Sequence, residues 1–83
     1  MAIRLLIENV RLLKGLSQQE LADIARAEYG SSITQEMVSN WENGKFMPRL
    51  DMLFDLACVM GVSVSDLVSR VDNEKDKPQQ LAG

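Results

Sequence analysis

Apolar residues recur every three or four positions along nearly the whole chain, which is the spacing of amphipathic helices. This spacing predicts a first helix over residues 2–14, with an apolar face made of Ile3, Leu6, Ile7, Val10 and Leu13. Gly15 comes directly afterwards and is suited to end the helix, because glycine adopts the left-handed conformation at little cost. No stretch alternates convincingly between apolar and polar residues, so we expect an all-α chain without strands.

Two helices follow this glycine, and a capping residue marks the start of each. Ser17 and Glu20 form a capping box, in which each side chain accepts the backbone amide of the other residue. The second helix is expected to end near Glu28. Thr34 is a suitable N-cap for a third helix over residues 35–43, which carries one polar face and ends at an Asn-Gly pair.

A fourth helix over residues 50–60 and a short fifth helix complete the predicted bundle. Gly61 ends the fourth helix, whose apolar face is expected to bury Leu50, Leu53, Phe54, Ala57 and Met60. Ser63 caps the fifth helix, and Leu67 and Val68 supply its apolar contacts. Five helices with short connections are therefore expected.

The elements divide the chain into one domain over residues 1–71 and a polar tail over residues 72–83. A chain of 83 residues supports one small core. The tail has almost nothing to bury, so we expect it to be disordered. Its mixed charges are typical of a solubilising end, although the run Pro78-Gln79-Gln80 also resembles a linker to a further domain.

Composition excludes most catalytic and metal chemistry. The chain has no histidine and one cysteine, so it cannot build the usual Cys/His zinc site or a histidine-activated nucleophile. We therefore expect no metal, no cofactor and no enzymatic activity. Cys58 cannot form an internal disulfide, and we expect it to be a small buried residue. With no apolar stretch near the roughly 20 residues that cross a bilayer, a cytoplasmic protein is expected.

Several short motifs stand in a characteristic order: LKGLSQQELA over residues 13–22, VSNWENGK over residues 38–45, and MGVSVSDL over residues 60–67. Together they resemble the Cro/cI-type (XRE-like) helix-turn-helix transcriptional regulators over about residues 10–68. The resemblance implies a five-helix bundle of the lambda-repressor-like type. It also implies a regulator, expected to be a repressor, that binds double-stranded DNA as a homodimer on a palindromic operator.

By this resemblance, the third helix is the recognition helix that enters the major groove. Its base-reading positions fall on Thr34, Gln35, Glu36, Met37 and Asn40. Gln18 falls where the family holds the DNA backbone, and Asn43 and Lys45 fall in the loop that grips the next phosphates. Arg11 and Glu42 match a pair that bridges the first and third helices, with the remaining donors of Arg11 directed at a phosphate.

Two features depart from the family pattern. The segment Arg26–Ile33 adds about six residues, so the turn between the second and third helices is expected to be enlarged. The net charge is −3, and the third helix has no basic residue; phosphate neutralisation is therefore expected to rest on Arg11, Lys14, Arg26, Lys45 and Arg49. These features leave a second interpretation open, a helix-turn-helix module of the antitoxin or anti-repressor type that binds a protein and has weak or no DNA binding.

The remaining large apolar residues divide between core and surface. Trp41 and Phe54 are expected in the core. Phe46 and Met47 lie in a loop, where they either pack on a neighbouring subunit or fold beneath Pro48. The dimer surface is expected on the fifth helix, at Val62, Val64, Val68 and Val71.

Overall fold

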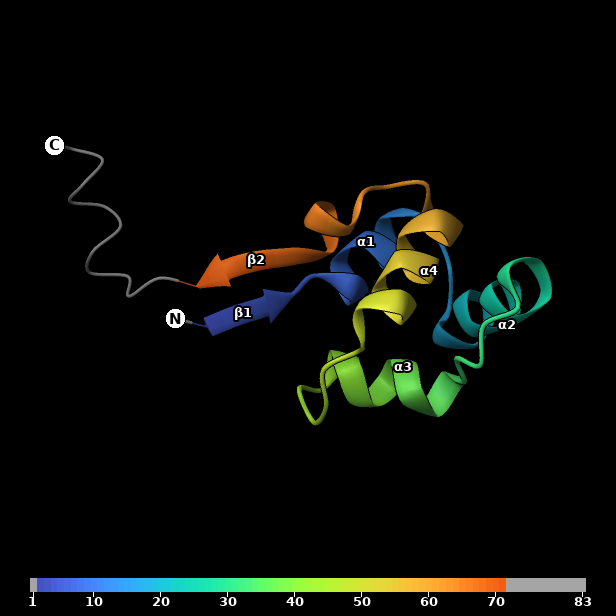
Figure 1. Ribbon diagram of the computed structural model, residues 1–83, viewed down its shortest axis with the longest axis horizontal. Coiled ribbons are helices and arrows are strands. Elements are labelled where there is room, and N and C mark those ends of the chain that lie inside the picture. Colours follow the sequence, from blue (N-terminus) through green and yellow to red (C-terminus); the bar gives the residue numbers. More distant parts are fainter. Residues whose placement is uncertain (1, 72–83) are drawn as a thin grey trace, which may run out of the picture.

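The computed structural model describes residues 2–71, and within that range four α-helices lie between two short strands. In chain order the bounds are β1 Ala2–Leu5, α1 Ile7–Leu13, α2 Gln18–Tyr29, α3 Gln35–Glu42, α4 Leu50–Met60 and β2 Val68–Val71. A 3₁₀ turn, η1 (Val64–Leu67), connects α4 with β2. The helices cluster together, and the paired strands extend from them to one side (Figure 1). The tail predicted over residues 72–83 lies outside the described residues.

β1 and β2 pair antiparallel, so the prediction of a chain without strands is wrong. The first helix begins at Ile7, because Ile3 and Leu5 also fit the two-residue period of a strand, and Leu5 lies opposite Val68 of β2. Two residues expected on the buried face of that helix are exposed. Ile3 is 55% exposed, and Leu13 at the end of α1 is 84% exposed.

The expected fifth α-helix is a single 3₁₀ turn that leads into β2. The Asp66 carboxylate accepts from the Ser63 amide across 3.0 Å and from the Ser63 hydroxyl across 2.9 Å, which fixes the start of this turn. The Leu6 amide donates to the Leu67 carbonyl across 2.8 Å and joins the end of η1 to the end of β1. Three of the valines expected on a dimer surface are half-buried against the core, namely Val62, Val64 and Val68.

Capping residues begin α2 and α3 at the predicted places. The Glu20 amide donates to Ser17 Oγ across 3.0 Å, and the Ser17 amide donates to Glu20 Oε1 across 2.8 Å. Thr34 Oγ1 accepts an amide from the first turn of α3. α2 continues to Tyr29, one residue further than expected, and α3 ends at Glu42, one residue earlier.

The core is formed by side chains from all four α-helices, from the connection before α3 and from η1. The buried apolar residues are Ile7, Leu21, Ala22, Ala25, Ile33, Val38, Trp41, Leu53, Leu56, Ala57, Met60 and Leu67. The expectation that Trp41 lies in the core is confirmed, since it is 4% exposed. The core therefore anchors α3 through its inner side.

The bounds predicted for α4 are confirmed, but its buried face was partly misassigned. Phe54 and Leu50 are 61% and 73% exposed, and Cys58 is exposed as well. At 3.6 residues per turn, Phe54 points about 100° away from Leu53, whereas Leu56 completes the buried face. The three mispredicted residues follow one another at four-residue spacing and form an outward stripe on α4.

The connection between α2 and α3 is folded against α2. Gly30 ends α2 with φ of 64°, a left-handed conformation that glycine adopts without strain. Arg26 Nη1 donates to the Ile33 carbonyl across 3.0 Å, while Arg26 Nη2 pairs with Asp23 across 2.6 Å. The Ile33 side chain is fully buried. The connection thus has defined contacts on both the backbone and the side-chain level.

Candidate nucleic-acid interface

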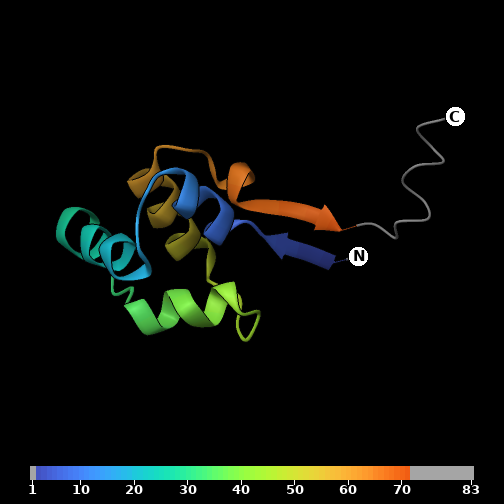
Figure 2. The same ribbon diagram turned by 180° about the vertical axis from the view of Figure 1, so that it is seen from behind.

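α3 lies along one side of the molecule, and no described element covers its outer side in either view (Figures 1 and 2). Val38 and Trp41 are buried and hold the helix against the core, whereas Gln35 and Glu36 are exposed. The connection from α2 reaches α3 at its N-terminal end and does not cross the outer side. An exposed helix of this kind fits the major groove of duplex DNA, which is about 12 Å wide.

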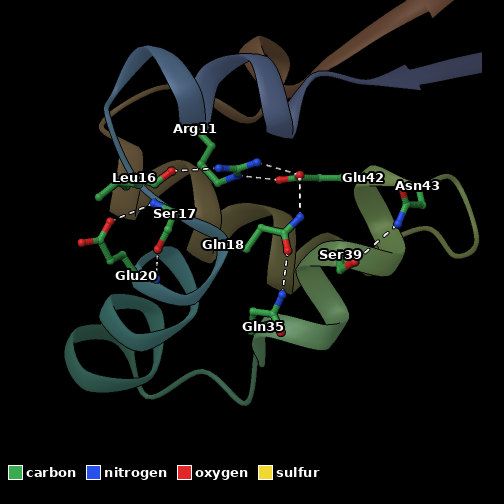
Figure 3. A network of polar contacts seen from close by, with 9 residues as sticks. All are labelled: Arg11, Leu16, Ser17, Gln18, Glu20, Gln35, Ser39, Glu42 and Asn43. Carbon is green, nitrogen blue, oxygen red and sulfur yellow. Dashed lines mark hydrogen bonds and ion pairs between the residues drawn. The ribbon is translucent and has the colours of Figure 1, made fainter.

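Arg11 and Glu42 form a buried ion pair between α1 and the last residue of α3 (Figure 3). Arg11 Nε donates to Glu42 Oε2 across 2.7 Å, and Arg11 Nη2 donates to Glu42 Oε1 across 2.9 Å. Arg11 Nη1 donates to the Leu16 carbonyl across 2.9 Å. The hydrogen bonds to Glu42 raise the pKa of Arg11 above its ordinary value. The pair therefore fixes the C-terminal end of α3 relative to α1.

Two glutamines extend this pair to the surface. Gln18 Nε2 donates to Glu42 Oε1 across 2.9 Å, and Gln35 Nε2 donates to Gln18 Oε1 across 2.7 Å (Figure 3). Because the Glu42 carboxylate only accepts, the amino end of the Gln18 amide faces it and the Gln18 oxygen faces Gln35. The chain of hydrogen bonds from Arg11 through Glu42 and Gln18 to Gln35, here called the polar network, orients the first side chain of α3.

The other predicted base-reading residues lie on α3 or directly before it, and they are outside the polar network. Thr34 is exposed, and its hydroxyl oxygen caps the helix. Glu36 is exposed, whereas Met37 and Asn40 are half-buried. The structure thus places the five predicted positions on the first two turns of one protruding helix or directly before it.

Of the residues predicted to contact phosphates, the polar network includes Arg11 and Gln18. Arg11 is 7% exposed, and its nitrogens donate to Glu42 and to a carbonyl, so its observed contacts are within the protein. Asn43 Nδ2 donates to Ser39 Oγ across 3.4 Å. Lys45 is exposed in the loop after α3, and its amide donates to the carbonyl of a residue on α3.

Four of the five basic residues expected to neutralise phosphates are exposed. Arg26 and Arg49 each pair with an aspartate, at 2.6 and 3.2 Å. Lys14 and Lys45 form no ion pair with any residue between 2 and 71. Both lysines are therefore available to DNA without breaking an ion pair within the described part of the chain.

The sequence predicted the Arg11–Glu42 pair but not the two glutamine hydrogen bonds. Gln18 and Gln35 lie 17 positions apart, and their contact depends on the angle at which α2 meets α3. Among residues 2–71 no cluster of His, Cys, Asp and Glu is arranged to hold a metal ion. Within the same range, each helix is too short or too polar to pass through a bilayer.

Comparison with known proteins bears on this site. No curated protein matches the chain significantly. A helix-turn-helix family model matches residues 7–67, which span α1 to η1 and include the whole polar network. The match covers most of the chain, in the same range where the Cro/cI-type motifs stand. The chain belongs to the Cro/cI-type (XRE-like) helix-turn-helix family of DNA-binding regulators.

Proposed function

We propose that this protein is a cytoplasmic, sequence-specific transcriptional repressor that binds a palindromic operator as a homodimer. The observation that carries the proposal is the polar network, which orients Gln35 at the exposed start of α3. An amide held in this way is prepared to form paired hydrogen bonds with a base edge, because it offers one donor and one acceptor side by side. The family match supports DNA binding, and the homodimer, the operator and repression are part of the proposal.

The base-reading roles follow from the chemistry of the side chains on α3. Gln35 and Asn40 suit adenine, whose major-groove edge offers one donor and one acceptor. Glu36 suits the amino group of cytosine, Met37 suits the methyl group of thymine, and the Thr34 hydroxyl suits either a base or a phosphate. Asn40 and Met37 are half-buried, so they would contact bases only with the outer part of their side chains.

The phosphate contacts in this proposal use few charges. Gln18, Asn43 and Lys45 would bind the backbone, and Arg11 would act mainly by holding Glu42 and Gln18 in place. Each neutralised phosphate contributes to the dependence of affinity on salt. A small number of lysine contacts therefore predicts a shallow salt dependence and a modest affinity for each monomer.

A binding selection from random DNA duplexes tests the proposal. The full chain at moderate salt is expected to enrich one palindromic sequence, and Gln35→Ala and Asn40→Ala are expected to abolish the enrichment while the protein remains folded. Gln19→Ala is the matched control, because Gln19 is an exposed glutamine on α2 that bonds Asp23 instead of the polar network. A folded, dimeric chain that enriches no sequence would contradict the proposal.

One observation favours a second candidate function, that of a protein-binding module. The loop after α3 exposes Phe46 by 63% and Met47 by 56%, and a groove of about 390 Å³ beside it is lined by Met37, Trp41 and Met52 among others. Methionine-rich apolar surfaces adapt readily to protein partners. In this case the Gln35→Ala and Asn40→Ala variants would retain their partner, whereas Phe46→Ser would lose it.

A further inference from the structure

β1 and β2 form a two-stranded ribbon that extends away from the helices (Figures 1 and 2). The register pairs Ala2 with Val71 at the outer end and Leu5 with Val68 at the end near the core. A two-stranded sheet in water is marginally stable, and three or more strands are normally required. Each strand of such a ribbon also has one edge of backbone groups that pairs readily with another strand. The ribbon is therefore suited to receive a further strand.

β1 has one edge that faces away from β2, and no other described strand pairs with this edge. A groove of about 490 Å³ borders β1, and Ile3, Arg4 and Leu5 line it. Its other walls come from α1 and from the C-terminal end of α3 with the following loop, through Glu8, Asn9, Trp41, Glu42, Asn43, Gly44 and Met47.

We propose that a second copy of this chain adds its own β1 to this edge, which gives a four-stranded sheet in the order β2, β1, β1 and β2. A twofold axis between the two β1 strands makes the contact self-complementary, as in most homodimers. This inference rests on the proposed homodimeric function and names the surface that would form the dimer. Of the valines expected from the sequence on the dimer surface, Val62, Val64 and Val68 are half-buried against the core of their own chain.

The pattern of β1 selects one register for this pairing. Ile3 and Leu5 lie on one face and Arg4 on the other, so a shift by one residue would bring apolar and charged faces together. A register centred on Arg4 would place two guanidinium groups directly opposite each other, which is unfavourable. A register centred on Ile3 places the two Ile3 side chains opposite each other and each Arg4 opposite Ala2. Ile3, at 55% exposure, would then be covered.

Cysteine crosslinking in the full chain tests this register. In a Cys58→Ser background, which removes the native exposed thiol, Ile3→Cys is expected to form a disulfide-linked dimer under mild oxidation. Directly opposite residues have Cα atoms about 4.5–5.5 Å apart, within the range of a disulfide. Arg4→Cys is the matched control on the same strand. In this register, position 4 of one copy lies two residues along the strand from position 4 of the other, with Cα atoms about 8 Å apart. Arg4→Cys is therefore expected not to form a disulfide.

A second variant tests the surface without a crosslink. Ile3→Lys places like charges opposite each other across the twofold axis and is expected to raise the dimer dissociation constant at least tenfold by sedimentation. The circular dichroism spectrum is expected to remain unchanged. Arg4→Gln is the control and is expected to dimerise as the unmodified chain does. A monomeric unmodified chain, an unaffected Ile3→Lys dimer, or equal crosslinking of both cysteine variants would overturn the inference.

These experiments separate the dimer surface from the proposed DNA function. If Ile3→Lys is monomeric and still binds a single half-site, then both proposals stand. A dimer that crosslinks through residue 3 but enriches no DNA sequence would contradict the DNA proposal and leave the surface supported. A chain that binds its operator as a dimer with unchanged affinity after Ile3→Lys would overturn the surface and leave DNA binding supported.

Discussion

The Gln35 side chain donates to the Gln18 side chain across 2.7 Å, and this bond joins the first residue of α3 to the first residue of α2. Gln18 in turn donates to Glu42, which Arg11 holds through two hydrogen bonds. The exposed amide at the start of α3 is thus supported by a buried charge pair at the other end of the same helix. In the proposed function, Gln18 would connect base reading with packing.

Gln18→Ala is expected to reduce specificity even if Gln18 itself reads no base. The substitution removes the acceptor that orients Gln35, and a well-placed paired contact to one base contributes about 1–3 kcal/mol of discrimination. Operator affinity is expected to fall about tenfold or more, with relaxed preference at the position that Gln35 reads. Binding to a set of single-base operator variants measures this. The same loss in Gln19→Ala would contradict the role of the network.

Glu42→Ala is expected to destabilise the fold strongly, because it leaves the Arg11 guanidinium buried without its partner. The loss in the free energy of unfolding is expected to be about 3–5 kcal/mol, measured by urea denaturation. The double variant Arg11→Met with Glu42→Leu is expected to recover much of this loss, since a buried ion pair itself adds little net stability. A double variant less stable than Glu42→Ala would show that the pair stabilises more than the apolar replacement.

Phe54→Ser and Leu56→Ala on α4 are expected to differ strongly in how much stability they cost. Phe54 is 61% exposed and Leu56 is fully buried, although both are large apolar residues on the same helix. Leu56→Ala is expected to cost about 2–5 kcal/mol, because it leaves a cavity in the core. Phe54→Ser is expected to change stability by about 0.5 kcal/mol or less. Thermal or urea unfolding of the two variants decides the assignment of the buried face.

The start of η1 is expected to weaken in acid. The Ser63 amide, followed by the Ser63 hydroxyl, donates to the Asp66 carboxylate and lowers the pKa of Asp66 below its ordinary value. Because the folded pKa is lower than the unfolded one, the stabilisation is present above the unfolded pKa and is lost as the pH falls through the folded pKa. The stability difference between the unmodified chain and Asp66→Asn is therefore expected to be constant near neutral pH and to shrink in acid. A difference that does not change with pH would contradict this.

The sequence predicted the elements whose signals are local. The capping box at Ser17, the N-cap at Thr34 and the bounds of α4 depend on residues within one or two turns, and the structure confirms them. The pair of Arg11 and Glu42 was predicted from the resemblance to the family and is also confirmed. The capping residues and the bounds of α4 needed no knowledge of how distant parts of the chain meet, whereas the ion pair joins residues 31 positions apart.

The features that the sequence did not predict depend on long-range pairing. Ile3 and Leu5 fit a helix as well as a strand. They form a strand because β1 pairs with β2, which lies at the other end of the described chain. The hydrogen bond between Gln18 and Gln35 depends on the angle between two helices. On α4, where apolar residues surround much of the helix, the periodicity alone did not separate Phe54 from Leu56.

The contact of Arg26 with the Ile33 carbonyl has a consequence for the position of α3. This hydrogen bond holds the residue directly before Thr34, the N-cap of α3, to the last turn of α2. The start of α3 is also held to the first residue of α2, through the hydrogen bond between Gln35 and Gln18. Two contacts from opposite ends of α2 therefore hold the start of α3 in place.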